Sequence, residues 1–189
     1  MAAGLMPRSP RRVAGPLGGL VLALALAGCG SGITAGGLGA TPPDAATPLI
    51  APTTAMAATL AALEAALASG GYDIGVPGQL YRPTEPASFV RVPRIEYRVN
   101  LADPSDGVLL IYEFTDAAGA AAGAQTLAGY LASGNGQTTF PGDTVFSVSY
   151  LGPTVTLSWF SAARSDDPLA GRGAFNLIAM VGTPVRVIK

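Results

Sequence analysis

Strict alternation of apolar and polar residues over positions 94–101 constrains the fold more than any other feature of the chain. Side chains two positions apart lie on the same face of a β-strand. The apolar members are Ile95, Tyr97, Val99 and Leu101. The turn-forming sequence Asp-Pro-Ser-Asp-Gly follows at 103–107, and an apolar segment follows at 108–115. The pattern predicts an antiparallel hairpin with one buried face, whose polar residues, such as Arg94 and Glu96, face solvent.

Helices are predicted on both sides of this hairpin along the chain. The first has Thr53 or Thr54 as its N-cap and ends at about Ser69, before two glycines. Its larger apolar residues recur at helical spacing and form one stripe. They are Met56, Leu60, Leu63 and Leu67. The second helix follows the N-cap Asp116 and ends at about Ser133, before Gly-Asn-Gly. Such a stripe needs a sheet or another helix to cover it.

Further apolar segments predict the remaining strands. Residues 144–150 and 154–162 form a second hairpin about Leu151-Gly152-Pro153, in which Val155 shares one face with Leu157 and Trp159. Other predicted strands are 72–76, 88–92 and 174–181, with a polar loop at 164–172 and an edge segment at 185–188. The predicted fold is therefore α+β. Two helices pack on an antiparallel sheet in α-β-β-α-β-β order, over residues 52–189.

The first 29 residues carry three features in order. Arg8, Arg11 and Arg12 form a basic region, residues 20–27 form an apolar run, and the chain's one cysteine, Cys29, follows. The run is shorter than the roughly 20 apolar residues that a transmembrane helix needs. Its length is typical of the apolar core of an export signal peptide, so the sequence predicts export.

The tetrad Leu26-Ala27-Gly28-Cys29 resembles the lipobox of bacterial lipoproteins, in which an aliphatic and two small residues precede cysteine. The resemblance implies that the Cys29 sulfur receives a diacylglyceryl group, that residues 1–28 are removed, and that the new amino group is acylated. Two or three acyl chains hold a protein on a membrane almost permanently. Since Gly30 and not Asp follows the cysteine, the resemblance leaves both the outer membrane and the outer face of the cytoplasmic membrane open.

Other interpretations of this segment stay open. An ordinary secretory leader, or an uncleaved anchor, would leave Cys29 incidental. The lone cysteine argues against both, because an unpaired thiol is a liability in an oxidising compartment. Arg11-Arg12 also allows export by a twin-arginine route, although the Val-Ala-Gly-Pro that follows departs from the expected pattern.

Residues 29–51 are predicted to form the lipidated cysteine and a flexible tether. The segment is rich in Gly, Ala, Thr and Pro, has no aromatic residue, and has Asp44 as its only charge. It cannot bury enough surface to fold. A plain spacer is the favoured interpretation, and O-linked sugar on its threonines is a second one.

Residue counts exclude several kinds of chemistry. The chain has no histidine and one cysteine, which rules out Ser-His-Asp and Cys-His catalysis, histidine-bound metals and an internal disulfide. A formal net charge of −1 gives no reason to expect nucleic acid as a partner. No Gly-x-Ser-x-Gly elbow or phosphate-binding glycine loop is present. The sequence therefore assigns no catalytic residue, no metal ligand and no cofactor beyond the lipid on Cys29.

Carboxylates are the remaining candidates for chemistry. Asp103 and Asp106 lie in one predicted turn, and Asp166 and Asp167 lie in one predicted loop, which allows a calcium site. Neither pair has the spacing of a known calcium motif, and aspartate is common in turns.

Glu96 and Glu113 lie on paired strands and could face each other as the acid pair of a glycosidase. Cross-strand ion pairing of Glu96 with Arg94 or Arg98 is the favoured interpretation. Several aromatic residues could line a groove, but we expect them in the core and at its rim. They are Tyr81, Tyr97, Tyr112, Tyr150, Trp159 and Phe160. Phe160, out of phase with Trp159, is predicted to be exposed.

Two segments, Ile-Tyr-Glu-Phe-Thr-Asp at 111–116 and Gly-Ala-Phe-Asn-Leu-Ile-Ala-Met-Val-Gly at 173–182, together with the element order, resemble a group of small bacterial lipoproteins. These have a tethered αββαββ-like domain and no assigned activity. The resemblance implies a shape and a place in the cell envelope, and it brings no catalytic residues.

Two hypotheses of function follow. The favoured one is a non-catalytic, membrane-anchored domain that binds another envelope protein or a small apolar ligand through the open face of its sheet or the 164–172 loop. The alternative is a carboxylate-dependent envelope enzyme such as a glycan-processing hydrolase. Two convergent carboxylates in a pocket would favour the second.

Overall fold

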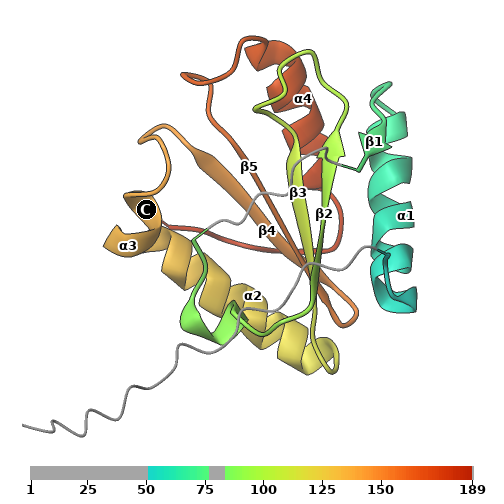
Figure 1. Cartoon of the computed structure of the whole chain (residues 1–189), viewed down its shortest axis with the longest axis vertical. Helices are drawn as coiled ribbons and strands as arrows, with labels where there is room; N and C mark the ends of the chain where they lie inside the picture. The colour runs from blue at the N-terminus through green and yellow to red at the C-terminus, as the bar shows by residue number, and fades with distance from the viewer. Residues whose placement is uncertain (1–50, 77–83, 189) are drawn as a thin grey trace, which may run out of the picture. The chain divides into compact units, whose positions relative to one another are not determined.

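Six antiparallel strands form one sheet in the order β1-β2-β3-β5-β4-β6 (Figure 1). The computed structural model describes residues 51–76 and 84–188. The strands are β1 (Ile74–Gly75), β2 (Arg94–Val99), β3 (Val108–Glu113), β4 (Val145–Leu151), β5 (Thr154–Phe160) and β6 (Thr183–Val185). The helices are α1 (Thr54–Ala68), the 3₁₀ helix η1 (Ala87–Phe89), α2 (Ala117–Ala132), α3 (Gly134–Gln137) and α4 (Pro168–Ile178).

The α+β fold is confirmed, as are both hairpins and the first two long helices. In the hairpins, Tyr97 lies opposite Leu109 and Val148 opposite Leu157. The predicted caps are present, since Thr53 Oγ accepts a hydrogen bond from the Met56 amide at 3.2 Å and Asp116 accepts one from the Gly119 amide at 2.7 Å. The predicted leader, Cys29, the tether up to residue 50 and Tyr81 lie outside the described residues.

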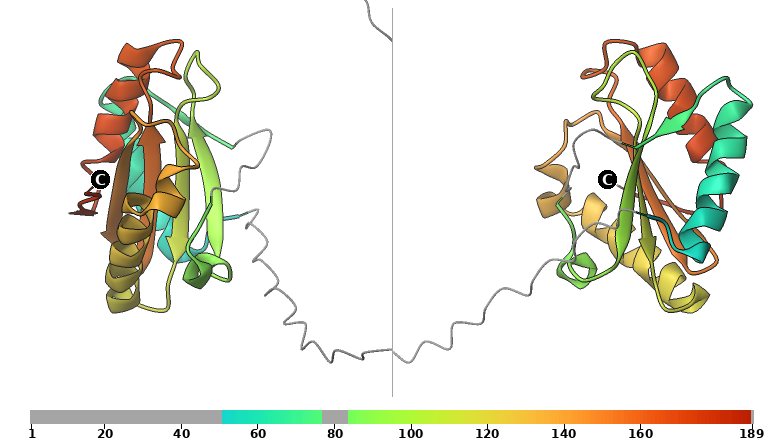
Figure 2. Two further views of the ribbon diagram at one scale, coloured as in Figure 1. Left: turned by 90° about the vertical axis from the view of Figure 1, so that its left-hand side faces the viewer. Right: turned by 45° about the vertical axis from the view of Figure 1, so that its right-hand side comes forward.

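Helices cover both faces of the sheet (Figure 2). On one face α1 packs against β3 and α4 packs against β5, and Met56, Ile95 and Ile178 lie in one core beneath them. On the other, α2 packs against β3, β4 and β5, with Leu110 and Leu127 in the core. No helix in the described residues combines the length and hydropathy needed to cross a bilayer.

The polar side of β2 is buried, so the predicted solvent-facing hairpin face is wrong. Arg94 and Glu96 are 2% and 3% exposed. A guanidinium nitrogen of Arg94 lies 3.6 Å from a carboxylate oxygen of Glu85. Glu85, which precedes β2 in the chain, thus lies beside Arg94 on this face, and period-two alternation by itself does not tell whether one face or both are covered.

The prediction of a loop at 164–172 and a strand at 174–181 is also wrong, because α4 occupies most of this segment. Asp167 caps it by accepting a hydrogen bond from the Ala170 amide at 3.2 Å, and Pro168 stands in its first turn. Its buried residues follow helical spacing. They are Gly171, Ala174 and Ile178.

Two further predictions, one of a strand and one of an exposed side chain, are wrong. The strand predicted at 88–92 is replaced by η1. Phe160, predicted to be exposed, is 2% exposed because α4 covers its face of the sheet. The Arg172 guanidinium lies 5.1 Å from the centre of the Phe160 ring.

Candidate functional site

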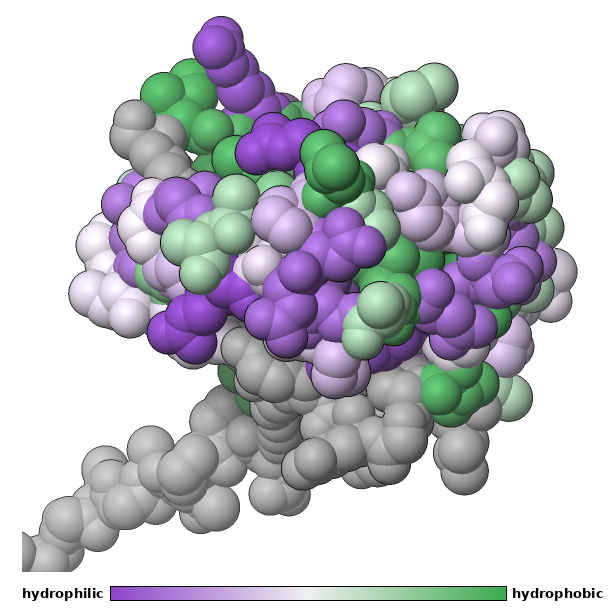
Figure 3. Space-filling view, turned by 90° about the horizontal axis from the view of Figure 1, so that it is seen from above, coloured by the Kyte–Doolittle hydropathy of each residue, from purple (hydrophilic) through white to green (hydrophobic). Residues whose placement is uncertain are grey.

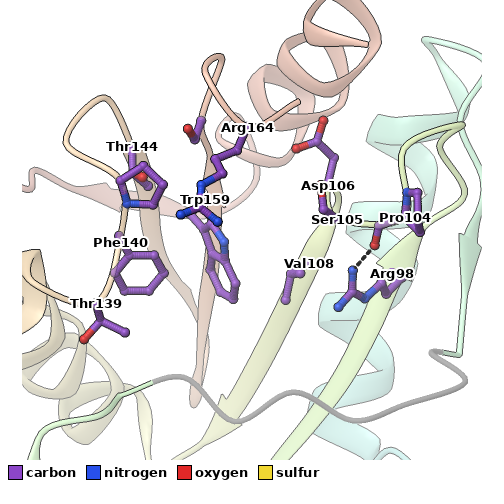
Figure 4. A pocket seen from close by; sticks show the side chains of 12 residues that line it. Arg98, Pro104, Ser105, Asp106, Val108, Thr139, Phe140, Thr144, Trp159 and Arg164 are labelled. Atoms are coloured by element: carbon purple, nitrogen blue, oxygen red, sulfur yellow. Dashed lines mark hydrogen bonds between the residues drawn. The ribbon is translucent and has the colours of Figure 1, made fainter. Parts of the chain in front are cut away.

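A cavity of about 470 Å³ lies where β2 and β5 end and β3 and β4 begin (Figure 4). Its lining comes from the β2–β3 hairpin, the segment before β4, and the segment from the end of β5 into the following loop. The lining residues used below are Arg98, Val108, Phe140, Trp159, Ser161 and Arg164. The cavity thus joins three parts of the chain that are far apart in sequence.

Its floor is a row of side chains across the sheet. Arg98 lies directly opposite Val108 in the β2–β3 pair. The β3–β5 register, in which Leu109 faces Ser158, places Trp159 beside Val108. Directly paired residues of neighbouring strands point to the same face. A cation and the chain's one tryptophan therefore lie two strands apart, about 10 Å at the usual strand spacing.

Aromatic rings form one wall. The Phe140 ring meets the Trp159 ring edge-on, with 5.4 Å between their centres, and meets the Phe146 ring in the same way at 4.9 Å. Edge-to-face contacts of this kind hold rings in place beyond the effect of burial. The wall is therefore rigid and apolar.

Two aspartates, one near each end of the loop after β5, hold this loop by accepting hydrogen bonds. Asp143 accepts hydrogen bonds from Ser161 Oγ at 2.7 Å and from the Ala163 amide at 2.9 Å. On the other side, Asp103 accepts one from the Asp166 amide at 2.6 Å. Hydrogen bonds from the Ser105 side chain and the Asp166 amide hold the pKa of Asp103 below 3.8. Hydrogen bonds from the Ala163 amide and the Ser161 side chain hold the pKa of Asp143 below 3.8 in the same way. Both are therefore ionised at neutral pH.

The pKa of Asp106 is shifted in the opposite direction. Burial raises the pKa of its carboxyl above 3.8, against a hydrogen bond from Ser165 Oγ at 2.5 Å, and the charges of Asp103, Asp167 and Asp166 raise it further. Its carboxylate lies against α4, where a Cβ added at Gly171 would stand 2.4 Å from Asp106 Oδ2. The carboxylate is thus directed toward α4 (Figure 4).

Two guanidinium groups line the cavity. Arg98 donates a hydrogen bond to the Pro104 carbonyl, and its Nε lies 4.0 Å from a Glu96 carboxylate oxygen. Arg164 is exposed, and no other described residue forms an ion pair with it. Its backbone is held by an amide hydrogen bond to the Ser161 carbonyl at 3.2 Å. Arg164 therefore offers its donors to a ligand from a fastened loop.

The calcium site and the acid pair, which the sequence allows but does not favour, are not formed by the described carboxylates. The turn with Asp103 and Asp106 does meet the loop with Asp166, but these carboxylates fasten the loops. No group of three or more Asp, Glu, His or Cys in the described residues can hold a metal ion. Glu96 pairs in register with Leu110, so Glu113 lies on the opposite face of the sheet and the two cannot act as an acid pair.

Phe140 lies in a segment with no recognisable sequence signal, and Arg164 was predicted in a loop at 164–172 that is shorter in the structure. Trp159 was predicted only as one of several aromatic candidates for a groove. Of the others, Tyr97 and Tyr112 are buried in the two cores. The missing signal is the pairing of β3 with β5, which brings Arg98 and Trp159 into one row. No local pattern encodes that pairing.

Comparison with protein-family models, curated proteins and solved structures finds no match to this chain. The fold and the cavity therefore define the class of protein only as an α+β domain with a cavity at one end of its sheet.

Proposed function

We propose that this protein is a lipid-anchored component of a bacterial cell envelope whose α+β domain binds a small molecule in the cavity without transforming it. The observation that carries the proposal is the cavity itself. Its volume of about 470 Å³ lies within the roughly 300–1,000 Å³ usual for small-molecule sites. Its walls are held by hydrogen bonds that Asp103 and Asp143 accept from the loop after β5, so the site is formed before a ligand arrives.

On the sheet faces and on the end of the domain that carries α4, a small ligand fits better than a protein partner does. The open sheet face considered as a docking surface is covered by helices on both sides (Figure 2). Seen from the end of the domain that carries α4, hydrophilic residues predominate and hydrophobic ones form small separate groups (Figure 3). A broad protein interface usually has an apolar centre.

The alternative, a glycan-processing hydrolase, requires two carboxylates facing one space. Asp106 is the one carboxylate among the described residues that line the cavity, and it is directed toward α4. We therefore keep the binding proposal.

Anchoring is tested with Cys29→Ser in cells. We expect the wild-type chain in the membrane fraction and in the detergent phase of a Triton X-114 extraction, and the variant in neither. Globomycin, which blocks lipoprotein signal peptidase, should leave the leader attached. A Cys29→Ser chain that still fractionates with membranes would overturn the anchor, and the cavity would be unaffected by that result.

Binding is tested through Trp159, whose fluorescence reports the cavity because the chain has one tryptophan. The full chain in phosphatidylcholine vesicles is mixed with the small-molecule extract of the cells that make it. We expect a change in emission and a raised unfolding temperature.

Val108→Phe, which fills the floor of the cavity, should abolish both effects. Because Val108 is buried, circular dichroism and the unfolding temperature without extract check that the variant folds. Val76→Phe, at an exposed position outside the cavity, is the control. No response of the wild-type protein to the extract would contradict the binding proposal.

A further inference from the structure

The floor of the cavity carries a cation at one end and an aromatic wall at the other. Arg98 begins the cross-strand row, Val108 continues it, and Trp159 ends it beneath Phe140. A ligand lying along this row meets a polar end and an apolar end. The row therefore selects an elongated, two-ended molecule.

The charges of the lining favour an anionic ligand. Arg98 and Arg164 supply two positive charges, and Asp106 supplies the one negative charge among the described lining residues. Since the Asp106 carboxylate is directed toward α4, the guanidinium groups face the cavity without a carboxylate between them (Figure 4). A guanidinium binds a carboxylate with two parallel hydrogen bonds.

Resting on the proposed function, we infer that the ligand is a small organic acid: a flat apolar or aromatic body over Val108 and against Trp159, carrying a single carboxylate that the positive charges of Arg98 and Arg164, at opposite ends of the row, attract (Figure 4). The described lining carries a net charge of +1, and Glu96, which does not line the cavity, lies 4.0 Å from Arg98 Nε, so Arg164 is the cation without an ion-pair partner among the described residues. The loop that carries Arg164 is fastened by Asp143 before Arg164 and by Asp103 after it, so its guanidinium needs little ordering on binding.

The test uses 2-naphthoate and 2-naphthamide, which share a flat two-ring body and differ in charge. Each is titrated into the full chain in phosphatidylcholine vesicles and followed by calorimetry, with empty vesicles as the blank. We expect naphthoate to bind at least about tenfold more tightly than naphthamide, the size of a charge-assisted hydrogen bond. Acetate, which lacks the rings, should bind at least about tenfold more weakly than naphthoate.

Arg164→Gln should weaken naphthoate binding about fivefold or more and leave naphthamide binding unchanged. This exposed side chain has no ion-pair partner among the described residues, so the variant should fold normally. Arg91→Gln changes another exposed arginine that does not line the cavity and is the matched control.

A second readout uses ionic quenchers of Trp159 fluorescence. Iodide should quench more strongly than caesium in the wild-type protein, and the difference should shrink in Arg164→Gln. This measurement needs no ligand, and it reports the sign of the charge around the ring.

The outcomes separate this inference from the proposed function. Equal binding of naphthoate and naphthamide, unaffected by Arg164→Gln, overturns the preference for an acid and leaves small-molecule binding in place. Binding of neither, with a response to the cell extract, overturns the ligand class alone. Binding of neither and no response to the extract overturns both.

Discussion

A buried arginine stands at the start of β2. The Arg94 side chain is 3% exposed, and the Glu85 side chain beside it is 2% exposed. Tyr112 donates a hydrogen bond of 2.7 Å to the other Glu85 oxygen. Burying two charges is costly unless each keeps its partner.

Arg94→Met should therefore lower the free energy of unfolding by about 3–5 kcal/mol, because the buried Glu85 carboxylate loses its guanidinium partner. Adding Glu85→Gln should recover much of the loss. Urea denaturation measures both, and Arg91→Gln, an exposed change, should stay within about 0.5 kcal/mol. An Arg94→Met variant whose free energy of unfolding equals that of the wild type would show that this ion pair contributes little to stability.

The loop carboxylates give the protein a defined response to acid. The pKa of Asp103 is lowered, so its contribution to stability is present above pH 3.8 and is lost as the pH falls through its folded-state pKa. Asp103→Asn should be less stable than wild type at neutral pH, and the difference should shrink on acidification.

Asp106, whose pKa is raised, should show the opposite trend, so Asp106→Asn should gain relative to wild type as the pH rises above 3.8. Unfolding temperatures measured across this range test both signs. If the unfolding temperatures of both variants, relative to the wild type, changed with pH in the same direction, the opposite pKa shifts of Asp103 and Asp106 would be contradicted.

Helix α2 depends on a close approach of Gly123 to Phe114, which lies three residues before the helix begins. A Cβ added at Gly123 would lie 2.3 Å from the tip of the Phe114 ring. That ring also packs edge-on against Phe89, with 5.5 Å between centres, so it has little room to move. Gly129, in the same helix, is exposed and has nothing within 4 Å of the same position.

Gly123→Ala should therefore lower the free energy of unfolding by about 1–3 kcal/mol, although alanine favours helices. Gly129→Ala should raise it by up to about 1 kcal/mol. Chemical denaturation of the two variants compares them directly. If both substitutions raised the free energy of unfolding, the Phe114 ring would have to move aside at little cost.

As a whole molecule, the proposed mature chain is acidic. Without residues 1–28 it would carry eight basic and twelve acidic residues, a net charge of −4. Such a protein is weakly repelled by anionic head groups, so the lipid must supply the attachment.

A wash with about 1 M salt, which screens charges beyond roughly 3 Å, should therefore leave it on the membrane. The bound fraction is measured by immunoblot, with a peripheral protein held by basic residues as the control. Release by salt would mean that charge holds the protein.

Local chemistry specified much of this fold in advance. Thr53 and Asp116 cap helices a few residues away, and the turns at 103–107 and 152 close hairpins between adjacent segments. These elements could be predicted because the interactions that define them join residues close in sequence. The lipobox at Leu26–Cys29 is also a local pattern, and the anchor it implies stays a prediction.

Long-range packing determined the rest. The run at 173–182 is apolar enough for a strand or a helix, and it becomes part of α4 where it covers β5 and Phe160. Arg94 is buried beside Glu85, a residue nine positions earlier in the chain. The row from Arg98 to Trp159 exists because β3 pairs with β5, two strands separated in the chain by α2, α3 and β4. Pairing at such a distance depends on which apolar surfaces bury each other best, and no short stretch of sequence carries that information.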